Sequence, residues 1–209
     1  MSTGLQMQKN RSKNETKRKQ ILDAATELFT EKGYATTSMD LIAKQADVSK
    51  QTVYSHFGSK DDLFSAAIEQ KCDSYRMLDF SLEDFSDVNV TLLAVAKRFF
   101  AMLTSRETLA VHKICAYECK SYPQLSELFY QAGPERLTTE VAKLMALLDE
   151  KKALSVPNPH HAAVQFLTML KGEAWLRIEF NTKKQLTPQE IDDYICSTVA
   201  MFIRAYAPQ

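Results

Sequence analysis

The segment from Thr37 to Lys60 constrains the fold more than any other part of this chain. It predicts two short helices joined by a tight turn, followed by the start of a third helix. Ser38 and Ser49 stand where each short helix would begin, and a serine there accepts a hydrogen bond from an otherwise unpaired backbone N–H. Asp47 stands at the turn, and Asp adopts the left-handed backbone conformation more readily than most residues. The pattern is a helix-turn-helix, which places its second helix in the major groove of DNA.

The second short helix has an inner and an outer side. Val53 and Phe57, four residues apart, would be buried. Short or planar hydrogen-bonding groups, suited to base edges and phosphates, occupy the outer side. Gln51 could form two hydrogen bonds with an adenine. The residues of this outer side are Lys50, Gln51, Thr52, Tyr54, Ser55 and His56.

Three ordered motifs lie in this region: Gly33-Tyr34-x-x-Thr37-Ser38, Ile42-Ala43-x-x-Ala46-x-Val48-Ser49 and Tyr54-x-His56-Phe57-x-Ser59-Lys60-x-x-Leu63. Together, over about residues 18–64, they resemble the TetR family of bacterial transcriptional regulators. The resemblance implies that some side chains face base edges, namely Lys50, Gln51 and Ser55. It implies that others hold phosphates, namely Thr52, Tyr54, His56 and Lys60, and that Thr37 and Ser38 approach the DNA backbone. Gln51 and Asp47 stand where many members have Gly.

A later segment, Ala116-Tyr117-Glu118-x-x-x-Tyr122-Pro123-x-Leu125-x-x-x-Phe129-Tyr130-x-x-Gly133-Pro134, is similar to the C-terminal region of the AefR-like subgroup of this family. The 209 residues include only five Gly and six Pro, and long segments carry helical periodicity. We therefore expect an all-α fold of about nine helices. The longer helices are expected over about residues 15–32, 60–77, 90–104, 106–120, 123–131, 134–152, 159–180 and 188–205.

The expected domains are a disordered basic arm over residues 1–14, a helix-turn-helix DNA-binding domain over 15–62, and a helical effector-binding and dimerisation domain over 63–209. The chain has 26 basic and 26 acidic residues, so its net charge does not indicate a nucleic-acid partner. The arm is locally basic, and either neutralises phosphates or is a solvated tail. No apolar window is long enough to span a membrane, and no signal peptide begins the chain. We expect a cytoplasmic protein with reduced cysteines.

The last two helices carry broad apolar stripes, which predict either a dimer interface or packing inside one subunit. The stripes contain Val164, Leu167, Leu170, Ala174, Trp175 and Ile178, then Ile191, Tyr194, Ile195, Thr198, Val199, Phe202 and Tyr206. The family resemblance favours a homodimer, which would bind a pseudo-palindromic double-stranded operator.

The middle helices are rich in large and soft side chains. From the residues alone, most of these belong to the core, whereas the resemblance implies a pocket for a small apolar or aromatic effector. Its candidate lining is Tyr75, Phe99, Met102, His112, Cys115, Phe129, Met145, Phe166 and Met169. His112-x-x-Cys115-x-x-x-Cys119 lacks a fourth zinc ligand, so we predict no metal site and no cofactor.

The sequence favours a DNA-binding repressor that a small effector releases from its operator. An enzyme is the competing class, but the chain has no nucleophile elbow, phosphate-binding glycine loop or zinc-protease motif. A DNA-binding regulator or architectural protein without an effector is the second alternative. A filled C-terminal core would favour that alternative.

Overall fold

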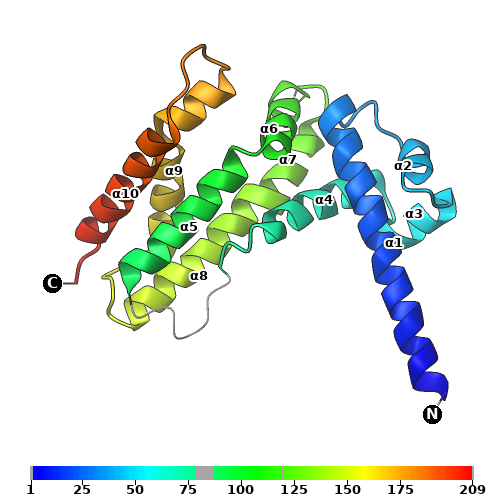
Figure 1. Cartoon of the computed structure of the whole chain (residues 1–209), viewed down its shortest axis with the longest axis horizontal. Coiled ribbons are helices and arrows are strands. Elements are labelled where there is room, and N and C mark those ends of the chain that lie inside the picture. The colour runs from blue at the N-terminus through cyan, green and yellow to red at the C-terminus, as the bar shows by residue number, and fades with distance from the viewer. Residues whose placement is uncertain (1, 79–86, 119, 209) are drawn as a thin grey trace. The chain divides into compact units, whose positions relative to one another are not determined.

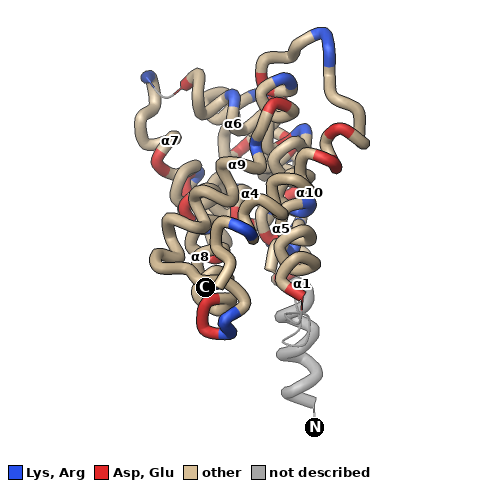
Figure 2. The backbone as a smooth tube through the Cα atoms, turned by 90° about the vertical axis from the view of Figure 1, so that its left-hand side faces the viewer, with Lys and Arg blue, Asp and Glu red and all other residues tan. Residues whose placement is uncertain are grey.

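The computed structural model describes residues 2–78, 87–118 and 120–208, with side chains placed from residue 14 onward (Figure 1). Every regular element in these ranges is a helix, so the predicted all-helical fold is confirmed. Lys and Arg are interspersed with Asp and Glu along the described backbone (Figure 2). The chain divides into two compact units, and each is described separately below.

The first unit consists of Met1–Lys71 and Ala110–Ala132. It contains α1 (Ser2–Lys32), α2 (Met39–Gln45), α3 (Lys50–Phe57), most of α4 (Lys60–Ser74), the later turns of α6 (Arg106–Glu118) and α7 (Pro123–Tyr130). The expected boundary after residue 62 falls inside α4, and the return of residues 110–132 was not expected. Cys115 and Leu125 are buried in the same core as Ile21, Ile42 and Val53, so packing between distant segments extends this unit.

Helix α1 begins at Ser2, whereas a disordered arm was predicted for residues 1–14. The early turns contain Gln, Lys, Arg and Met and no proline, and these residues favour helix continuation. Gly33 ends the helix with a positive φ of 82°, and its N–H donates to the Phe29 carbonyl at 3.1 Å. The rings of Phe29 and Tyr34 both pack against Phe64, with centroids 5.2 Å apart in each pair.

The second unit consists of Cys72–Leu109 and Gly133–Gln209. Its main helices are α5 (Val88–Leu103), α8 (Arg136–Glu150), α9 (Pro159–Glu179) and α10 (Pro188–Ala205), and α9 packs against the other three. Phe166 and Phe202 meet edge to face in the core, with centroids 4.9 Å apart. Pro134, expected in the first turn of a helix, lies within a π-helical segment (Gln131–Glu135) that precedes α8.

Helix α9 is not continuous, although the sequence predicted one helix over residues 159–180. Gly172 has φ 52° and ψ −165°, which breaks the helical path. A Cβ atom at this position would lie 2.5 Å from Cε1 of Tyr194, so only glycine fits beneath that ring. The Tyr194 hydroxyl donates to the Met169 carbonyl at 2.7 Å, which holds α10 against the break.

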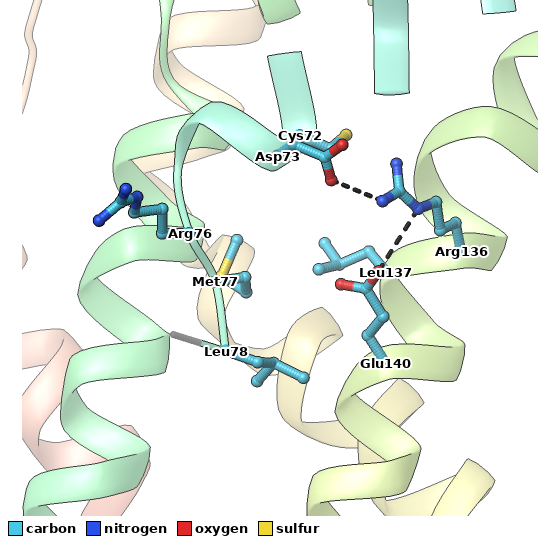
Figure 3. A pocket seen from close by; sticks show the side chains of 8 residues that line it. All are labelled: Cys72, Asp73, Arg76, Met77, Leu78, Arg136, Leu137 and Glu140. Carbon is cyan, nitrogen blue, oxygen red and sulfur yellow. Dashed lines mark hydrogen bonds and ion pairs between the residues drawn. The ribbon is translucent and has the colours of Figure 1, made fainter. Parts of the chain in front are cut away.

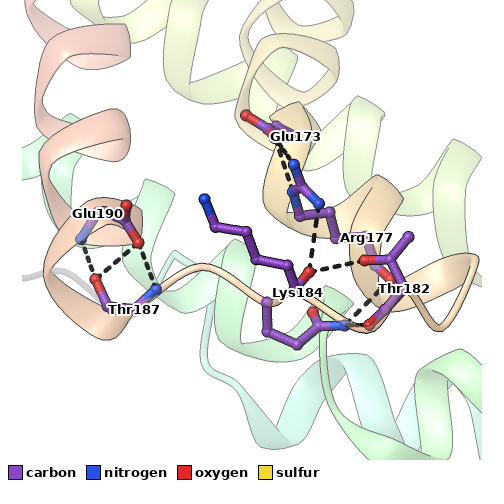
Figure 4. A network of polar contacts seen from close by, with 7 residues as sticks. Glu173, Arg177, Thr182, Lys184, Thr187 and Glu190 are labelled. Carbon is purple, nitrogen blue, oxygen red and sulfur yellow. Dashed lines mark hydrogen bonds and ion pairs between the residues drawn. The ribbon is translucent and has the colours of Figure 1, made fainter.

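Polar contacts order the connection from α9 to α10 (Figure 4). Arg177 pairs with Glu173 at 2.5 Å and donates to the Lys184 carbonyl. Thr187 and Glu190 form a capping box at the start of α10, in which each side chain bonds the other residue's backbone N–H. The box fixes where α10 begins.

Candidate nucleic-acid interface

The predicted local geometry of the helix-turn-helix is present. The Ser38 hydroxyl accepts from the Leu41 N–H at 3.2 Å, and the Ser49 hydroxyl accepts from the Thr52 N–H at 3.1 Å. Asp47 adopts the left-handed conformation with φ 50°, as the turn required. Both short helices therefore start at the serines that the sequence indicated.

Helix α3 buries one side and exposes the other. Val53 is fully buried and Phe57 nearly so. Gln51, Tyr54 and Ser55 are exposed, and 44% of Tyr54 is accessible. This exposed face carries an amide, a phenol and a hydroxyl, which are groups that hydrogen-bond to base edges and phosphates.

Two further outer residues of α3, Thr52 and His56, are half-buried. The Thr52 hydroxyl lies 2.8 Å from the Ser49 hydroxyl, and the Thr52 carbonyl accepts from the Ser55 hydroxyl at 2.9 Å. The His56 ring packs against the ring of Phe57, with centroids 6.1 Å apart. Thr52 and His56 thus have structural contacts in addition to the DNA contacts predicted for them.

Lys50 forms an ion pair with Asp40 of α2. Its Nζ lies 2.8 Å from Oδ1 and 3.0 Å from Oδ2 of that carboxylate. Both side chains are exposed, and the hydrogen bond to Asp40, with its charge, raises the pKa of Lys50. The ammonium also lies 6.0 Å from the centroid of the Tyr54 ring. Asp40 was not among the site residues predicted from the sequence.

Lys60 points into the first unit. Its ammonium donates to the carbonyls of Tyr34 at 3.0 Å and Thr37 at 3.1 Å. It lies 4.0 Å from the centroid of the Tyr34 ring, and the Tyr34 hydroxyl donates to Asp61. Burial lowers the pKa of Lys60, against the opposing charges of Asp61 and Glu118. Two of its three N–H donors are therefore engaged within the protein.

Thr37 is a core residue, although it was predicted to approach the DNA backbone. Only 1% of it is accessible, and its hydroxyl donates to the Gly33 carbonyl at 2.7 Å. A buried hydroxyl must bond within the protein, which explains the inward orientation. Ser38 next to it is exposed and keeps the predicted position.

The nine candidate effector-binding residues are divided between the two units, and eight of them, all but His112, belong to the hydrophobic cores. Cys115 is buried in the first unit, where Phe129 packs beside it and the His112 ring lies 6.1 Å from the Phe129 ring. The other six belong to the core of the second unit: Tyr75, Phe99, Met102, Met145, Phe166 and Met169. This division agrees with the alternative that the residues alone favoured, in which most of them are core residues.

A cavity of about 380 Å³ lies in the second unit between the end of α4 and the start of α8 (Figure 3). Arg136 reaches Asp73 at 2.5 Å and Glu140 at 3.4 Å across its wall. None of the nine candidates lines this cavity. In the sequence, its charged residues look like those of an ordinary solvent-facing helix. The cavity could therefore not be predicted, because only the fold brings these residues together. The lining is Cys72, Asp73, Arg76, Met77, Leu78, Arg136, Leu137 and Glu140.

Within the described residues, no group of three His, Cys, Asp or Glu side chains is placed to hold a metal ion. Cys119, part of the considered His-Cys-Cys pattern, lies outside the described residues. No single described helix has the length and hydropathy needed to cross a membrane. Among the described helices, only the bent pair Val88–Leu103 and Arg106–Glu118, taken together, has the required length and hydropathy.

A capped helix-turn-helix with an exposed polar recognition helix defines a DNA-binding protein. Residues 21–67 match the family of bacterial regulatory proteins named tetR, and residues 90–208 match the C-terminal domain of AefR-like transcriptional repressors. The chain belongs to the TetR family, whose members are DNA-binding transcriptional regulators, typically repressors, and not enzymes. The family resemblance seen in the sequence is thus confirmed.

Individual relatives agree with this assignment. The flavonoid-responsive regulator FrrA superimposes with a TM-score of 0.74 at 33% identity, covering 93% of this chain and 99% of FrrA. The biofilm operon negative transcriptional regulator IcaR of Staphylococcus epidermidis is 28% identical over 196 residues, 88% of this chain and 97% of IcaR. The regulator HbdR of an Aromatoleum strain is 44% identical over 61 residues, 29% of this chain. The matched segment covers 27% of the length of HbdR. In two further curated relatives it covers 44% and 30% of their length.

Proposed function

We propose that the chain is a homodimeric repressor that binds a pseudo-palindromic operator and leaves it when a small molecule binds the second unit. The observation that carries the DNA-binding part is the exposed face of α3. Gln51 and Ser55 would contact base edges there, and Tyr54 would contact a phosphate. Ser38, Thr52 and His56 would add backbone contacts, with Lys50 as a further base contact. A protein acting on chromosomal DNA would work in the cytoplasm.

Selection from a randomised duplex library tests the operator. We expect the wild-type protein to enrich an inverted repeat whose half-sites lie about 34–36 Å apart or a multiple of that distance. A library that shows no enriched sequence, although the protein binds DNA, would favour an architectural role.

Exposed apolar side chains on α9 and α10 support the dimer. Several residues of the predicted stripes are buried within one subunit, and Phe202 is only 1% accessible. A charge at Phe202 would therefore unfold the subunit and would not test the interface. The large apolar side chains left exposed on these helices are Val164, Leu176, Tyr194 and Met201.

The dimer test uses Leu176→Glu and Met201→Glu. Each places a charge in the proposed interface, where it would lose its hydration without a partner. We expect monomers in sedimentation and loss of operator binding, with the helical content kept. Val90→Glu is the matched control, because Val90 is also exposed but lies at the start of α5. A Met201→Glu protein that remains dimeric would place the interface elsewhere.

The cavity beside Asp73 and Arg136 supports an effector site. Its wall combines apolar Met77 and Leu137 with charged groups, so it suits an amphipathic molecule better than the mostly apolar one expected from the sequence. FrrA, a structural relative, is described as flavonoid-responsive. Planar aromatic compounds with several hydroxyl groups are therefore the first class to test.

Helix α4 would transmit the effector signal. It is one continuous helix from Lys60, in the first unit, to Ser74, beyond the start of the second. A ligand that separates Asp73 from Arg136 would move the end of this helix. A coupling free energy of about 1–3 kcal/mol would suffice for a usable switch.

Thermal shift with a panel of flavonoids, followed by operator binding, tests the effector. Compounds that raise the melting temperature should lower operator affinity. Leu137→Phe, which reduces the cavity, should abolish both effects, whereas Ala146→Phe on an exposed position of α8 should abolish neither. Compounds that stabilise Leu137→Phe as much as the wild type would exclude this cavity as their binding site. Stabilisation without DNA release would favour a regulator that lacks an effector response.

A further inference from the structure

The ion pair between Asp40 and Lys50 lies on the exposed polar side of the helix-turn-helix. The Lys50 ammonium sits between both carboxylate oxygens, at 2.8 and 3.0 Å. In these side chains, 56% of Lys50 and 65% of Asp40 is accessible. The pair is therefore a weak, exposed interaction that a competing anion can replace.

Lys50 is also the main positive charge of the recognition helix. Helix α3 contains no other Lys or Arg, and all of its residues are described. The nearest following lysine, Lys60, directs its ammonium to the carbonyls of Tyr34 and Thr37. Whether the Lys50 ammonium is engaged by Asp40 or available thus largely determines how strongly this helix attracts phosphates.

A phosphate oxygen offers Lys50 little that Asp40 does not already provide, because both are solvated oxygen anions. On arbitrary DNA, exchanging Asp40 for a phosphate would therefore gain Lys50 little. A guanine offers two acceptors, O6 and N7, in the partly desolvated major groove, and a well-placed base contact discriminates by roughly 5- to 150-fold. Only such a base competes well with the carboxylate.

We propose that Asp40 is a specificity-determining residue that withholds Lys50 from phosphates on arbitrary DNA and releases it to a guanine in the operator. The inference rests on the proposed DNA-binding function and adds to it an internal carboxylate that competes with phosphates for Lys50. Specificity often arises in this way, from groups that penalise the wrong partner. Asp40 would weaken all binding slightly but would weaken non-operator binding more.

Fluorescence anisotropy with Asp40→Asn tests the proposal, using a mixed-sequence duplex and the duplex that wild-type protein enriches from a random library. The variant should bind the mixed-sequence duplex more tightly, by about fivefold at physiological salt for each phosphate contact regained. Its plot of log affinity against log salt should steepen by about 0.9 per contact, or about 1.8 for a dimer. Its affinity for the enriched duplex should rise less, so the specificity ratio should fall.

Two controls separate this mechanism from a general loss of negative charge. Asp192→Asn breaks another exposed pair, with Lys97 at 2.6 Å in the second unit, and should leave the specificity ratio unchanged. Lys50→Ala combined with Asp40→Asn should bind the mixed-sequence duplex no more tightly than Lys50→Ala alone.

The outcomes distinguish the two proposals. A gain that persists without Lys50 would show that Asp40 acts through general repulsion, and would overturn the inference. So would an unchanged specificity ratio and salt slope in Asp40→Asn. Wild-type protein that binds no duplex at all would overturn the DNA-binding function itself, and this inference with it.

Discussion

The ammonium of Lys60 lies 4.0 Å from the centroid of the Tyr34 ring and donates hydrogen bonds to the carbonyls of Tyr34 and Thr37. These contacts tie the first residue of α4 to the connection between α1 and α2. The lysine thus supports the position of the helix-turn-helix within its unit. A side chain expected to bind phosphate therefore also has a structural role.

We first predict that Lys60→Ala lowers the stability of the protein by about 1–2 kcal/mol, because the carbonyls of Tyr34 and Thr37 lose a charged donor. The melting temperature should fall by about 2–8 °C in circular dichroism. DNA affinity should fall equally for all sequences, because Lys60 is predicted to contact a phosphate and no base. Lys44→Ala, at an exposed lysine of α2, is the stability control. An unchanged melting temperature in Lys60→Ala would show that the contacts with Tyr34 and Thr37 contribute little.

The second prediction concerns base readout. Gln51→Ala should reduce discrimination at one base pair of each half-site by about 1–3 kcal/mol. Tyr54→Phe removes only a hydroxyl and should weaken binding to all duplexes alike, since a phosphate contact carries no sequence information. Anisotropy on operator duplexes with single base-pair changes separates the two patterns. If Gln51→Ala kept the wild-type base preferences, direct readout by Gln51 would be wrong.

Third, Gly172→Ala should destabilise the protein by about 2–4 kcal/mol. The added Cβ would lie within 2.9 Å of three atoms of the Tyr194 side chain, and the φ of 52° is unfavourable for alanine. Thermal unfolding of Gly172→Ala, Tyr194→Ala and the double variant measures the coupling. The double variant should be more stable than the sum of the single effects predicts. Additive effects would mean that the glycine is needed for its backbone conformation alone.

The fourth prediction concerns thiol reactivity and pH. Burial, together with the charge of Glu118, raises the pKa of Cys115 to about 12, whereas Cys196 is exposed. At about pH 8 only about one in ten thousand Cys115 thiols is ionised, so it should react with a disulfide reagent far more slowly than Cys196. Single-cysteine variants would show the difference, and denaturant should remove it. Fast labelling of folded Cys115 would contradict its burial.

The same shift has a consequence for alkaline stability. The unfolded thiol has a pKa near 9.0 and the folded thiol one of about 12, so the folded state retains the proton in this interval. Stability from this group is therefore present below about pH 9 and is lost as the pH rises towards 12. Cys115→Ala should flatten the decline in unfolding free energy over that range, although its absolute stability should be lower because a buried side chain is lost.

Local chemistry made much of the fold predictable. Ser38, Ser49 and Asp47 each act through bonds or backbone angles within a few residues, so their roles could be inferred from the sequence. The same holds for Pro159 and Pro188, which occupy the first turns of α9 and α10 as expected. Helical periodicity likewise indicated the apolar faces of the longer helices.

Relations between distant segments were not predictable in this way. The break at Gly172 depends on the ring of Tyr194, which belongs to another helix. The inward orientation of Lys60 depends on the carbonyls that the turn after α1 presents to it. The pairing of Asp73 with Arg136 joins residues that are 63 positions apart. In each case the deciding partner cannot be identified from periodicity, because it is adjacent only in the folded chain.

The first unit is built from two separate segments of the chain, one ending at Lys71 and the other beginning at Ala110. Its core includes Cys115 and Leu125, which are encoded beyond the segment that forms the helix-turn-helix. A chimeric regulator made by joining residues 1–71 to a foreign sensor would expose the surface that these residues cover. Exchange of sensors, in evolution or in the laboratory, therefore has to retain residues 110–132 with the DNA-binding helices, and to replace the two segments on either side of them together.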